Sequence, residues 1–196
     1  FKQFVIKQDK CAMKVGTDGV LLGAWADVPI MFDENTSSSF NTIHPSPRIL
    51  DIGTGTGLVA LMLAQRFPTA IVDAVEIDSS AAEQAKKNVE CSPFASRVNV
   101  FESSIQQFAE SATARYDAIV SNPPFKLDFP DERNIVAADA LRFWAGVPNA
   151  PTTINPDKPK MEIYTCFIQH MIYSLKAGTG KGAIVVPTGF ITAKSG

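Results

Sequence analysis

Arg48-Ile-Leu-Asp-Ile-Gly-Thr-Gly-Thr-Gly-Leu58 is the stretch that decides the fold of this chain of 196 residues. Its first half, Arg48–Ile52, is a short apolar run that predicts a strand, and glycines follow at Gly53, Gly55 and Gly57. An apolar helix pattern covers residues 58–67. Glycine tolerates positive φ and lets a ligand approach the backbone, so we expect a binding loop between strand and helix. The spacing differs from the Gly-x-Gly-x-x-Gly of dinucleotide-binding folds, which disfavours a dehydrogenase.

The sequence downstream alternates strand and helix patterns. We expect strands at residues 71–77, 98–101, 116–121 and 182–186, and helices at residues 79–90, 104–111 and 162–176. Ser80 and Glu83 have the spacing of a capping box, and Gly178 is a candidate C-cap. This alternation predicts an α/β fold with a doubly wound, mostly parallel sheet that is covered on both faces. Such sheets bind ligands at the carboxyl ends of their strands.

Two long stretches, residues 29–47 and 126–160, have the polar, proline-containing composition of loops. We interpret the chain as one domain over residues 1–196. Its expected parts are an N-terminal segment, a core, a mobile loop beside the target, and a last helix with the fifth strand, at residues 1–28, 48–125, 126–160 and 161–196.

The composition excludes several classes of protein. The formal net charge is -2, which rules out a generally basic nucleic-acid-binding protein. Lys2, Lys7, Lys10 and Lys14 still form a local excess, which predicts either a phosphate-binding patch or a solvated terminus. No basic-then-apolar opening and no apolar run of sufficient length is seen, so we expect neither a secretory leader nor a membrane span. Three cysteines without a Cys-x-x-Cys pair predict no metal site and no disulfide framework, and they favour a reducing, cytoplasmic setting.

An acidic residue, Glu76, ends the second predicted strand, nineteen residues after Gly57. A carboxylate in this place can accept hydrogen bonds from both hydroxyls of a ribose. The glycine loop, its strand–helix context and this acid together favour a ligand site over a tight turn with a surface glutamate.

The segment Asn122-Pro123-Pro124-Phe125 directly follows the fourth predicted strand. Proline stiffens the turn, and the Asn122 amide oxygen and the Pro123 carbonyl can accept both hydrogens of one planar amine. Phe125 can stack on the ring that carries this amine. Accepting both hydrogens favours a pyramidal amine and frees its lone pair as charge develops. We therefore expect a catalytic turn formed by Asn122, Pro123, Pro124 and Phe125.

Neither histidine is predicted to act as a general base at this turn. His44 lies in a predicted loop, and His170 lies off the apolar stripe of the last predicted helix. We expect both side chains at the surface, and the amine chemistry above requires no strong base.

These motifs together resemble the class I methyltransferases, which have a Rossmann-like fold and bind S-adenosylmethionine. The resemblance implies that the glycine loop passes under the methionine part of the cofactor and that Glu76 holds its ribose. It implies that Asp51 orders the loop or contacts the methionine end, and it places Ser104 near the adenine, where the family often has Asp. The core residues that it assigns to the cofactor are Asp51, Gly53, Thr54, Gly55, Gly57, Glu76, Ile77 and Ser104.

The Asn-Pro-Pro-Phe turn resembles the motif of amino-methyltransferases, which act on adenine N6, cytosine N4 or a glutamine amide. Residues 1–125 are further similar to the bacterial tRNA(Val) adenine-N6 methyltransferases. This similarity rests on FKQF at 1–4, CAMKVGTDGVLLGAWA at 11–26, LDIGTGTGL at 50–58, Leu61–Arg66, DAVEID at 73–78 and SNPPF at 121–125, and most of all on KVGTDG at 14–19. In that family the second of these segments lies over the cofactor, which adds Lys14, Gly16, Thr17 and Asp18 to the expected cofactor contacts.

The rest of the chain is similar to a different family, the N6-adenine DNA methylases of restriction–modification systems. This similarity rests on FKL at 125–127, RFWAGV at 142–147, FIQHMIYSL at 167–175 and GKGAIVVPTGF at 180–190. The change of resemblance at the shared turn leaves a hybrid chain as an open interpretation. The family fold usually adds two strands after the fifth, and without them we expect an exposed sheet edge and either a monomer or a homodimer.

The function favoured by these features is transfer of a methyl group from S-adenosylmethionine to N6 of adenine in tRNA. The first alternative is DNA adenine-N6 methylation, which requires a base to be flipped from the duplex. A protein glutamine methyltransferase and a catalytically impaired cofactor-binding module are further alternatives. Ser104 in place of an acid is the feature that favours the impaired module.

Overall fold

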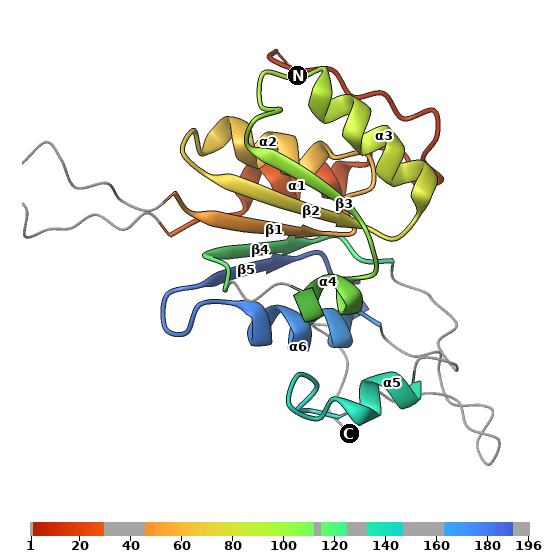
Figure 1. Cartoon of the computed structure of the whole chain (residues 1–196), viewed down its shortest axis with the longest axis vertical. Coiled ribbons are helices and arrows are strands. Elements are labelled where there is room, and N and C mark those ends of the chain that lie inside the picture. The colour runs from red at the N-terminus through yellow and green to blue at the C-terminus, as the bar shows by residue number, and fades with distance from the viewer. Residues whose placement is uncertain (1, 30–45, 112–114, 125–132, 147–162, 190–196) are drawn as a thin grey trace, which may run out of the picture.

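The computed structural model describes residues 2–29, 46–111, 115–124, 133–146 and 163–189. Its centre is an all-parallel, five-stranded sheet with the strand order β3-β2-β1-β4-β5 (Figure 1). The strands are β1 (Arg48–Ile52), β2 (Ile71–Glu76), β3 (Val98–Glu102), β4 (Ala118–Ser121) and β5 (Lys181–Ile184). The helices are α1 (Thr17–Trp25), α2 (Leu58–Arg66), α3 (Ser79–Glu90), α4 (Ile105–Ser111), α5 (Arg133–Ala138) and α6 (Tyr164–Ser174). Within the described ranges, no helix is long and apolar enough to cross a membrane.

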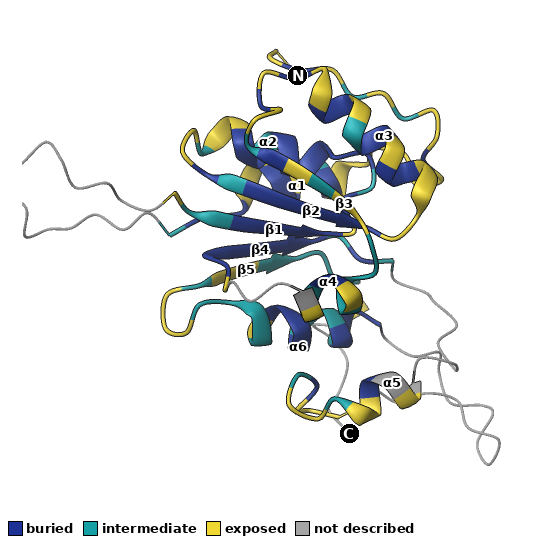
Figure 2. Cartoon of the chain, viewed as in Figure 1, coloured by how far each residue is buried: buried dark blue, intermediate teal, exposed yellow. Residues whose placement is uncertain are grey.

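The inner strands are buried on both faces, which explains their continuous apolar runs. Ile49 and Val72 pack with α1, α2 and α3 on one face, whereas Leu50 and Val75 pack with α4 and α6 on the other. Figure 2 shows these buried strands in dark blue between the two helical layers. The predicted α/β class and the doubly wound sheet are therefore confirmed.

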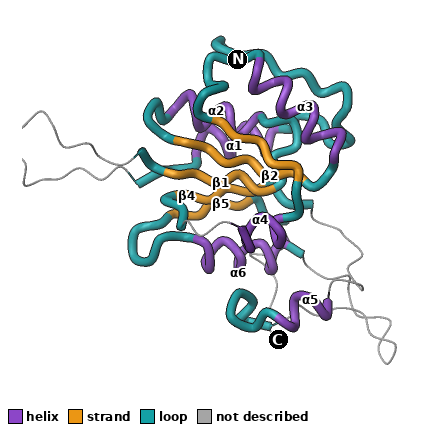
Figure 3. Tube along the Cα trace, in the orientation of Figure 1, coloured by secondary structure: helices purple, strands orange, loops and turns teal. Residues whose placement is uncertain are grey.

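The sheet has its topological switch point between β1 and β4. From β1 the chain builds outward through β2 and β3, and it then crosses to β4 and β5 on the opposite side (Figure 3). Ile52 is in register with Val75 on one neighbour and with Ser121 on the other. The segments that follow β1, β2 and β4 therefore leave the sheet side by side, where open α/β sheets bind their ligands.

Helix α1 was not among the predicted helices, because the N-terminal segment lacks a one-sided apolar stripe. It packs against α2 through Gly23, where an added Cβ would lie 2.7 Å from Sδ of Met62. The Arg66 guanidinium at the end of α2 donates to the carbonyls of Gly23 at 2.8 Å and Ala26 at 2.6 Å. These bonds satisfy carbonyl groups at the end of α1 and join the two helices.

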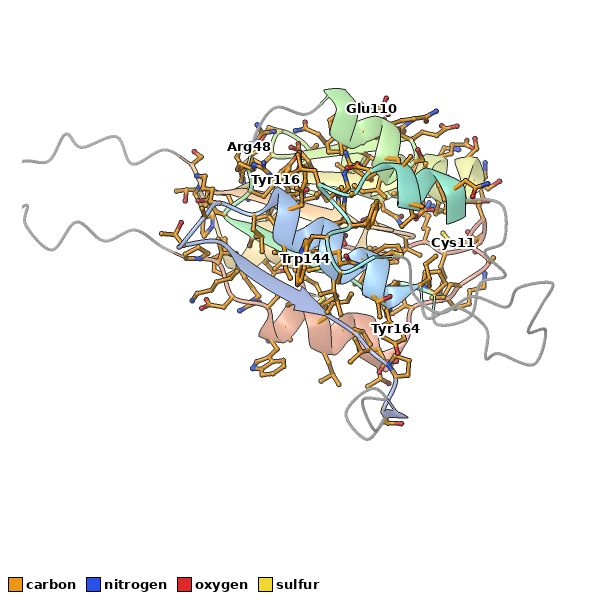
Figure 4. The ribbon with its side chains drawn as sticks, turned by 90° about the horizontal axis from the view of Figure 1, so that it is seen from below. Cys11, Arg48, Glu110, Tyr116, Trp144 and Tyr164 are labelled. Atoms are coloured by element: carbon orange, nitrogen blue, oxygen red, sulfur yellow. The ribbon has the colours of Figure 1, made fainter. Side chains whose placement is uncertain are left out.

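The amino end of the sheet carries a buried polar network. The Asp73 carboxylate accepts hydrogen bonds from Arg48 at 2.5 Å, from the Tyr116 hydroxyl at 3.0 Å and from Asn99 at 2.9 Å. Figure 4 shows Arg48 and Tyr116 together at one end of the molecule and Cys11 toward the other. Since Asp73 is satisfied by three donors, this end of the sheet has a structural role.

Three details of the sequence-based prediction are wrong. The cap of α3 is Asp78, whose carboxylate accepts from the Ala81 N–H at 2.7 Å, and Ser80 lies inside the helix. Helix α6 ends at Ser174, and Gly178 lies in the following turn. The reason is that Leu175 adopts an extended conformation and pairs with Tyr116. The stretch predicted as a loop over residues 126–160 contains helix α5.

His170 is buried, with only 4% of its surface exposed, and its prediction as a surface residue is wrong. Burial lowers the pKa of its imidazole to about 4, the Arg142 cation lowers it further, and Asp139 opposes this. The segment after α5 covers this side of α6, because the neighbouring Gln169 accepts from the Ala145 N–H at 2.8 Å and donates to the Gly146 carbonyl at 3.2 Å. The other histidine, His44, lies outside the described residues.

Candidate functional site

The glycine loop turns sharply at the end of β1. Gly53, Gly55 and Gly57 have φ values of 73°, 57° and 80°, which lie in the left-handed region that favours glycine. The N–H groups of Gly53 and Thr54 both donate to the Val75 carbonyl of β2, at 2.9 and 3.1 Å. The loop is therefore fixed to the neighbouring strand before it enters α2.

The outer side of this loop is open. A Cβ added at Gly53 or Gly55 would meet nothing within 4 Å, whereas one at Gly57 would contact Ala85 at 3.5 Å. At Gly57 a Cβ would fit beside α3 and the positive φ is what favours glycine, while Gly53 and Gly55 leave backbone accessible to a ligand. The site fits a group that lies against the loop at the N-terminus of α2.

Glu76 supports the glycine loop from the end of β2. Its carboxylate accepts from the Gly55 N–H at 2.8 Å and from the Asp78 N–H at 3.0 Å, and 8% of the residue surface is exposed. Each carboxylate oxygen can accept more than one hydrogen bond, so these contacts leave acceptor capacity for hydroxyl groups of a ligand.

Asp51 lies beneath the loop and is buried. The Thr54 hydroxyl donates to it at 2.6 Å, and the Ala60 N–H also donates to it. Burial raises the pKa of the Asp51 carboxyl to about 7; these two bonds lower it, and the charge of Glu76 raises it. In this geometry Asp51 orders the loop from inside, which is one of the two roles expected for it.

The N-terminal segment lies beside the same end of the sheet. Cys11 is buried, and its pKa is raised first by this burial and then by the nearby charge of Glu76. Gly16 precedes α1, and Thr17 and Asp18 form its exposed first turn. Lys14 donates to the Gln8 carbonyl at 2.6 Å, so its ammonium group is held within the segment.

The two remaining expected cofactor residues have different surroundings. Ile77, directly after Glu76, is 74% exposed and is free to pack against a flat ligand. The Ser104 hydroxyl accepts from the Gln107 N–H at 3.2 Å and so caps the start of α4. The Ser103 N–H donates to the Glu76 carbonyl at 2.9 Å, which holds the start of this segment against β2.

The Asn-Pro-Pro turn begins where β4 ends. Ser121, the last residue of β4, is fully buried, and its hydroxyl donates to the Ile52 carbonyl at 2.8 Å. Asn122 and Pro124 are partly exposed, Pro123 is buried, and Phe125 lies outside the described residues. Since neighbouring strands lie about 4.8 Å apart, the turn and the glycine loop begin beside each other.

The family model of the methyltransferase small domain matches residues 32–141, which include the glycine loop, Glu76 and the Asn-Pro-Pro turn. The chain belongs to this family. A curated tRNA1(Val) (adenine(37)-N6)-methyltransferase from Parabacteroides distasonis is 52% identical over 128 residues, which are 65% of this chain and 47% of that protein. The protein of the same name from Cronobacter sakazakii is 50% identical over 126 residues, 64% of this chain and 45% of its own length. The chain thus spans about half the length of these relatives.

Two solved structures are also similar to this methyltransferase domain. TrmN from Thermus thermophilus is 20% identical with a TM-score of 0.48, over 74% of this chain and 35% of that chain. TrmK from M. capricolum, in complex with S-adenosyl-homocysteine, is 18% identical with a TM-score of 0.41, over 56% of this chain and 41% of that chain.

Sequence reasoning missed two residues that join parts of the site. Ser121 connects the Asn-Pro-Pro turn to the end of β1, and Asn88 of α3 connects the N-terminal segment to the glycine loop. Asn88 lies on the same face of α3 as the buried residues Ala81, Ala85 and Val89, and this placement was the available signal.

Proposed function

We propose that this domain binds S-adenosylmethionine and transfers its methyl group to the N6 amine of adenine in tRNA. The observation that carries the proposal is the position of the Asn122-Pro123 turn directly beside the open glycine loop, at the switch point of the sheet. Ser121 links the two segments through its bond to the Ile52 carbonyl. A methyl acceptor and a methyl donor held by these segments would lie side by side.

The cofactor would lie against the open backbone of Gly53 and Gly55, with Glu76 accepting from its ribose hydroxyls. Ile77 would cover its adenine, and Ser104 would lie near the edge of that ring. When bound, the cofactor supplies a sulfonium-activated methyl group. The fit is supported by the open space outside the two glycines and by the spare acceptor capacity of the Glu76 carboxylate.

The Asn-Pro-Pro turn would activate the acceptor amine. The Asn122 amide oxygen and the Pro123 carbonyl would accept the two N–H groups, which favours a pyramidal nitrogen whose lone pair faces the methyl group. The N–C bond would form as the S–C bond of the donor breaks, which leaves S-adenosylhomocysteine, and the nitrogen would lose one proton to water. Phe125 would stack on the adenine ring and hold it in this orientation.

Adenine in tRNA is the favoured target because the curated relatives carry that activity in their names. A base in an RNA loop can leave its stack at little cost and enter a pocket beside the turn. The chain is acidic overall, so phosphate contacts need a local patch, for which Lys2 and Lys7 are exposed candidates. Lys10 is less available because it forms an ion pair with Glu83 at 2.7 Å. We place this activity in the cytoplasm, where a tRNA-modifying enzyme meets its substrate.

The test is incubation with methyl-labelled S-adenosylmethionine, in parallel with unmodified tRNA and unmethylated DNA, followed by identification of the labelled nucleoside. The proposal expects N6-methyladenosine in tRNA. Label in DNA would favour the DNA alternative, and label in neither substrate, with cofactor bound, would favour a cofactor-binding module. Asn122→Ala should abolish most of the transfer while cofactor affinity stays nearly unchanged. A large loss of cofactor affinity in that variant would remove Asn122 from its assigned role.

A further inference from the structure

Asn88 is an asparagine of α3 that makes three hydrogen bonds although only 2% of its surface is exposed. Its side-chain oxygen accepts from the Lys7 N–H at 3.0 Å, and its side-chain nitrogen donates to the Lys7 carbonyl at 2.8 Å. The same nitrogen donates to the Thr56 carbonyl of the glycine loop at 2.8 Å. One buried side chain therefore joins two segments that lie far apart in sequence.

The segment that Asn88 holds is closed upon itself. In this N-terminal loop, residues 7–16, the side-chain oxygen of Gln8 accepts from the Val15 N–H at 2.8 Å, and the Gln8 carbonyl accepts from Lys14 at 2.6 Å. The start and the end of the N-terminal loop are thus linked next to the residue that Asn88 binds. The conformation of the N-terminal loop therefore depends on the position of Lys7.

The N-terminal loop reaches the side of the site where Glu76 lies. Cys11, at its middle, is buried and lies close enough to Glu76 for the charge of that carboxylate to raise the pKa of the thiol. The loop therefore comes near Glu76 at the end of β2, while Asn88 fixes it to the glycine loop on the side of α3. Within the N-terminal loop, the hydrogen bonds of Lys14 and of the Gln8 side chain each join a side chain to a backbone group of the same loop.

We infer that Asn88 is a positioning residue that pins the N-terminal loop to the glycine loop, so that the two segments enclose the cofactor as one unit. This inference rests on the proposed function. Asn88 touches neither the cofactor nor the target in this scheme, and it acts through Lys7 and Thr56. Its removal should open the N-terminal loop, speed the release of bound cofactor and leave the strands of the sheet in place.

Other contacts of the N-terminal segment are weaker or lie elsewhere. Lys10 pairs with Glu83 at 2.7 Å, but about half of each side chain is exposed, and such surface pairs contribute little. Phe4 packs edge-on against Phe94 at 6.1 Å between ring centroids, which anchors the chain before the N-terminal loop begins. Among the polar contacts described above, those of the buried Asn88 are therefore the ones that tie the N-terminal loop to the glycine loop.

The experiment compares Asn88→Ala with Glu90→Ala, a control at an exposed position two residues further along α3. Amide hydrogen exchange without ligand measures opening of the N-terminal loop, and calorimetric titration with S-adenosylhomocysteine measures the cofactor site. In Asn88→Ala we expect residues 7–16 to exchange about tenfold faster or more, with β1 and β4 unchanged, and the dissociation constant to rise about tenfold. Glu90→Ala should match the wild type in both measurements.

Gln8→Ala provides a second variant, because it opens the N-terminal loop from its outer end while Asn88 keeps its three bonds. It should speed exchange at Val15 and weaken S-adenosylhomocysteine binding less than Asn88→Ala does. Unchanged exchange in residues 7–16 of Asn88→Ala would overturn the inference, and so would faster exchange there with unchanged affinity. If the wild type itself does not bind S-adenosylhomocysteine, the proposed function fails, whereas the exchange data still decide whether Asn88 holds the N-terminal loop.

Discussion

Replacing Asp51 with asparagine should change how stability depends on pH. The wild-type carboxyl has a pKa of about 7 in the folded protein and 3.8 as its ordinary value. This difference corresponds to roughly 4 kcal/mol in favour of the protonated form, because burial penalises the charge. The preference of the folded protein for the protonated Asp51 carboxyl contributes its full amount to stability below pH 3.8. This contribution falls progressively above pH 3.8 and is lost as the pH rises through 7. Between pH 5 and pH 8 the loss amounts to roughly 2.5 kcal/mol.

Asparagine can keep both contacts of the wild-type side chain without a titrating proton. Its oxygen can accept from the Ala60 N–H, and its nitrogen can donate to the Thr54 hydroxyl. Because asparagine stands in for the protonated carboxyl, we expect Asp51→Asn to exceed the wild type by roughly 1.5 kcal/mol at pH 5 and by roughly 4 kcal/mol at pH 8. The difference between the two proteins is the informative quantity, because His170 titrates with the opposite sign over part of this range.

The assay is urea unfolding at pH 5, 6, 7 and 8, with free energies of unfolding from linear extrapolation. Asp9→Asn, at an exposed position, serves as the control for loss of one negative charge. A difference between Asp51→Asn and wild type that stays constant from pH 5 to pH 8 would refute the reasoning. It would mean that the Asp51 carboxyl does not change its charge in this range, and that its burial beneath the glycine loop is relieved in solution.

Three further predictions concern single side chains. Ser121→Ala removes a buried hydrogen bond to the Ile52 carbonyl, so we expect the free energy of unfolding in urea to fall by about 1–3 kcal/mol. The single-turnover rate should fall more than the affinity for S-adenosylhomocysteine does. An unchanged rate would contradict the role of Ser121 in linking the Asn-Pro-Pro turn to β1. Glu76→Ala should weaken cofactor binding by at least about tenfold in calorimetry, and an unchanged dissociation constant would remove Glu76 from the site. His170→Gln should gain melting temperature relative to the wild type as the pH falls from 7 to 5, because the buried wild-type imidazole has a folded pKa of about 4 and costs the folded protein stability below pH 6.5. A difference in melting temperature that stays constant over this range would argue against a buried neutral His170.

The sequence predicts where the segments of the candidate site lie on the sheet, because the features that place them are local. The strand, the three glycines and the Asn-Pro-Pro turn each occupy a few consecutive residues, and parallel strands bring their carboxyl ends together without further information. Glu76 follows the same logic, since it ends the strand next to the glycine loop. These residues could be placed before the structure was known.

The features that sequence reasoning missed depend on contacts between distant segments. Helix α1 has neither a side-chain cap nor a one-sided stripe, and its position is set by Gly23 and Arg66 at its contact with α2. His170 looks like a surface residue on α6 alone, and its burial comes from the segment that follows α5. Asn88 looks like an ordinary polar residue of an amphipathic helix until the Lys7 backbone is placed beside it.

The double hydrogen bond of Glu76 to the Gly55 and Asp78 backbone has a thermodynamic consequence. The loop acquires its shape during folding, so its conformational entropy is already lost before a ligand arrives. Binding then requires little ordering of this loop, and more of the contact energy remains as affinity. A domain built in this way should bind its cofactor with a small entropic penalty from the glycine loop.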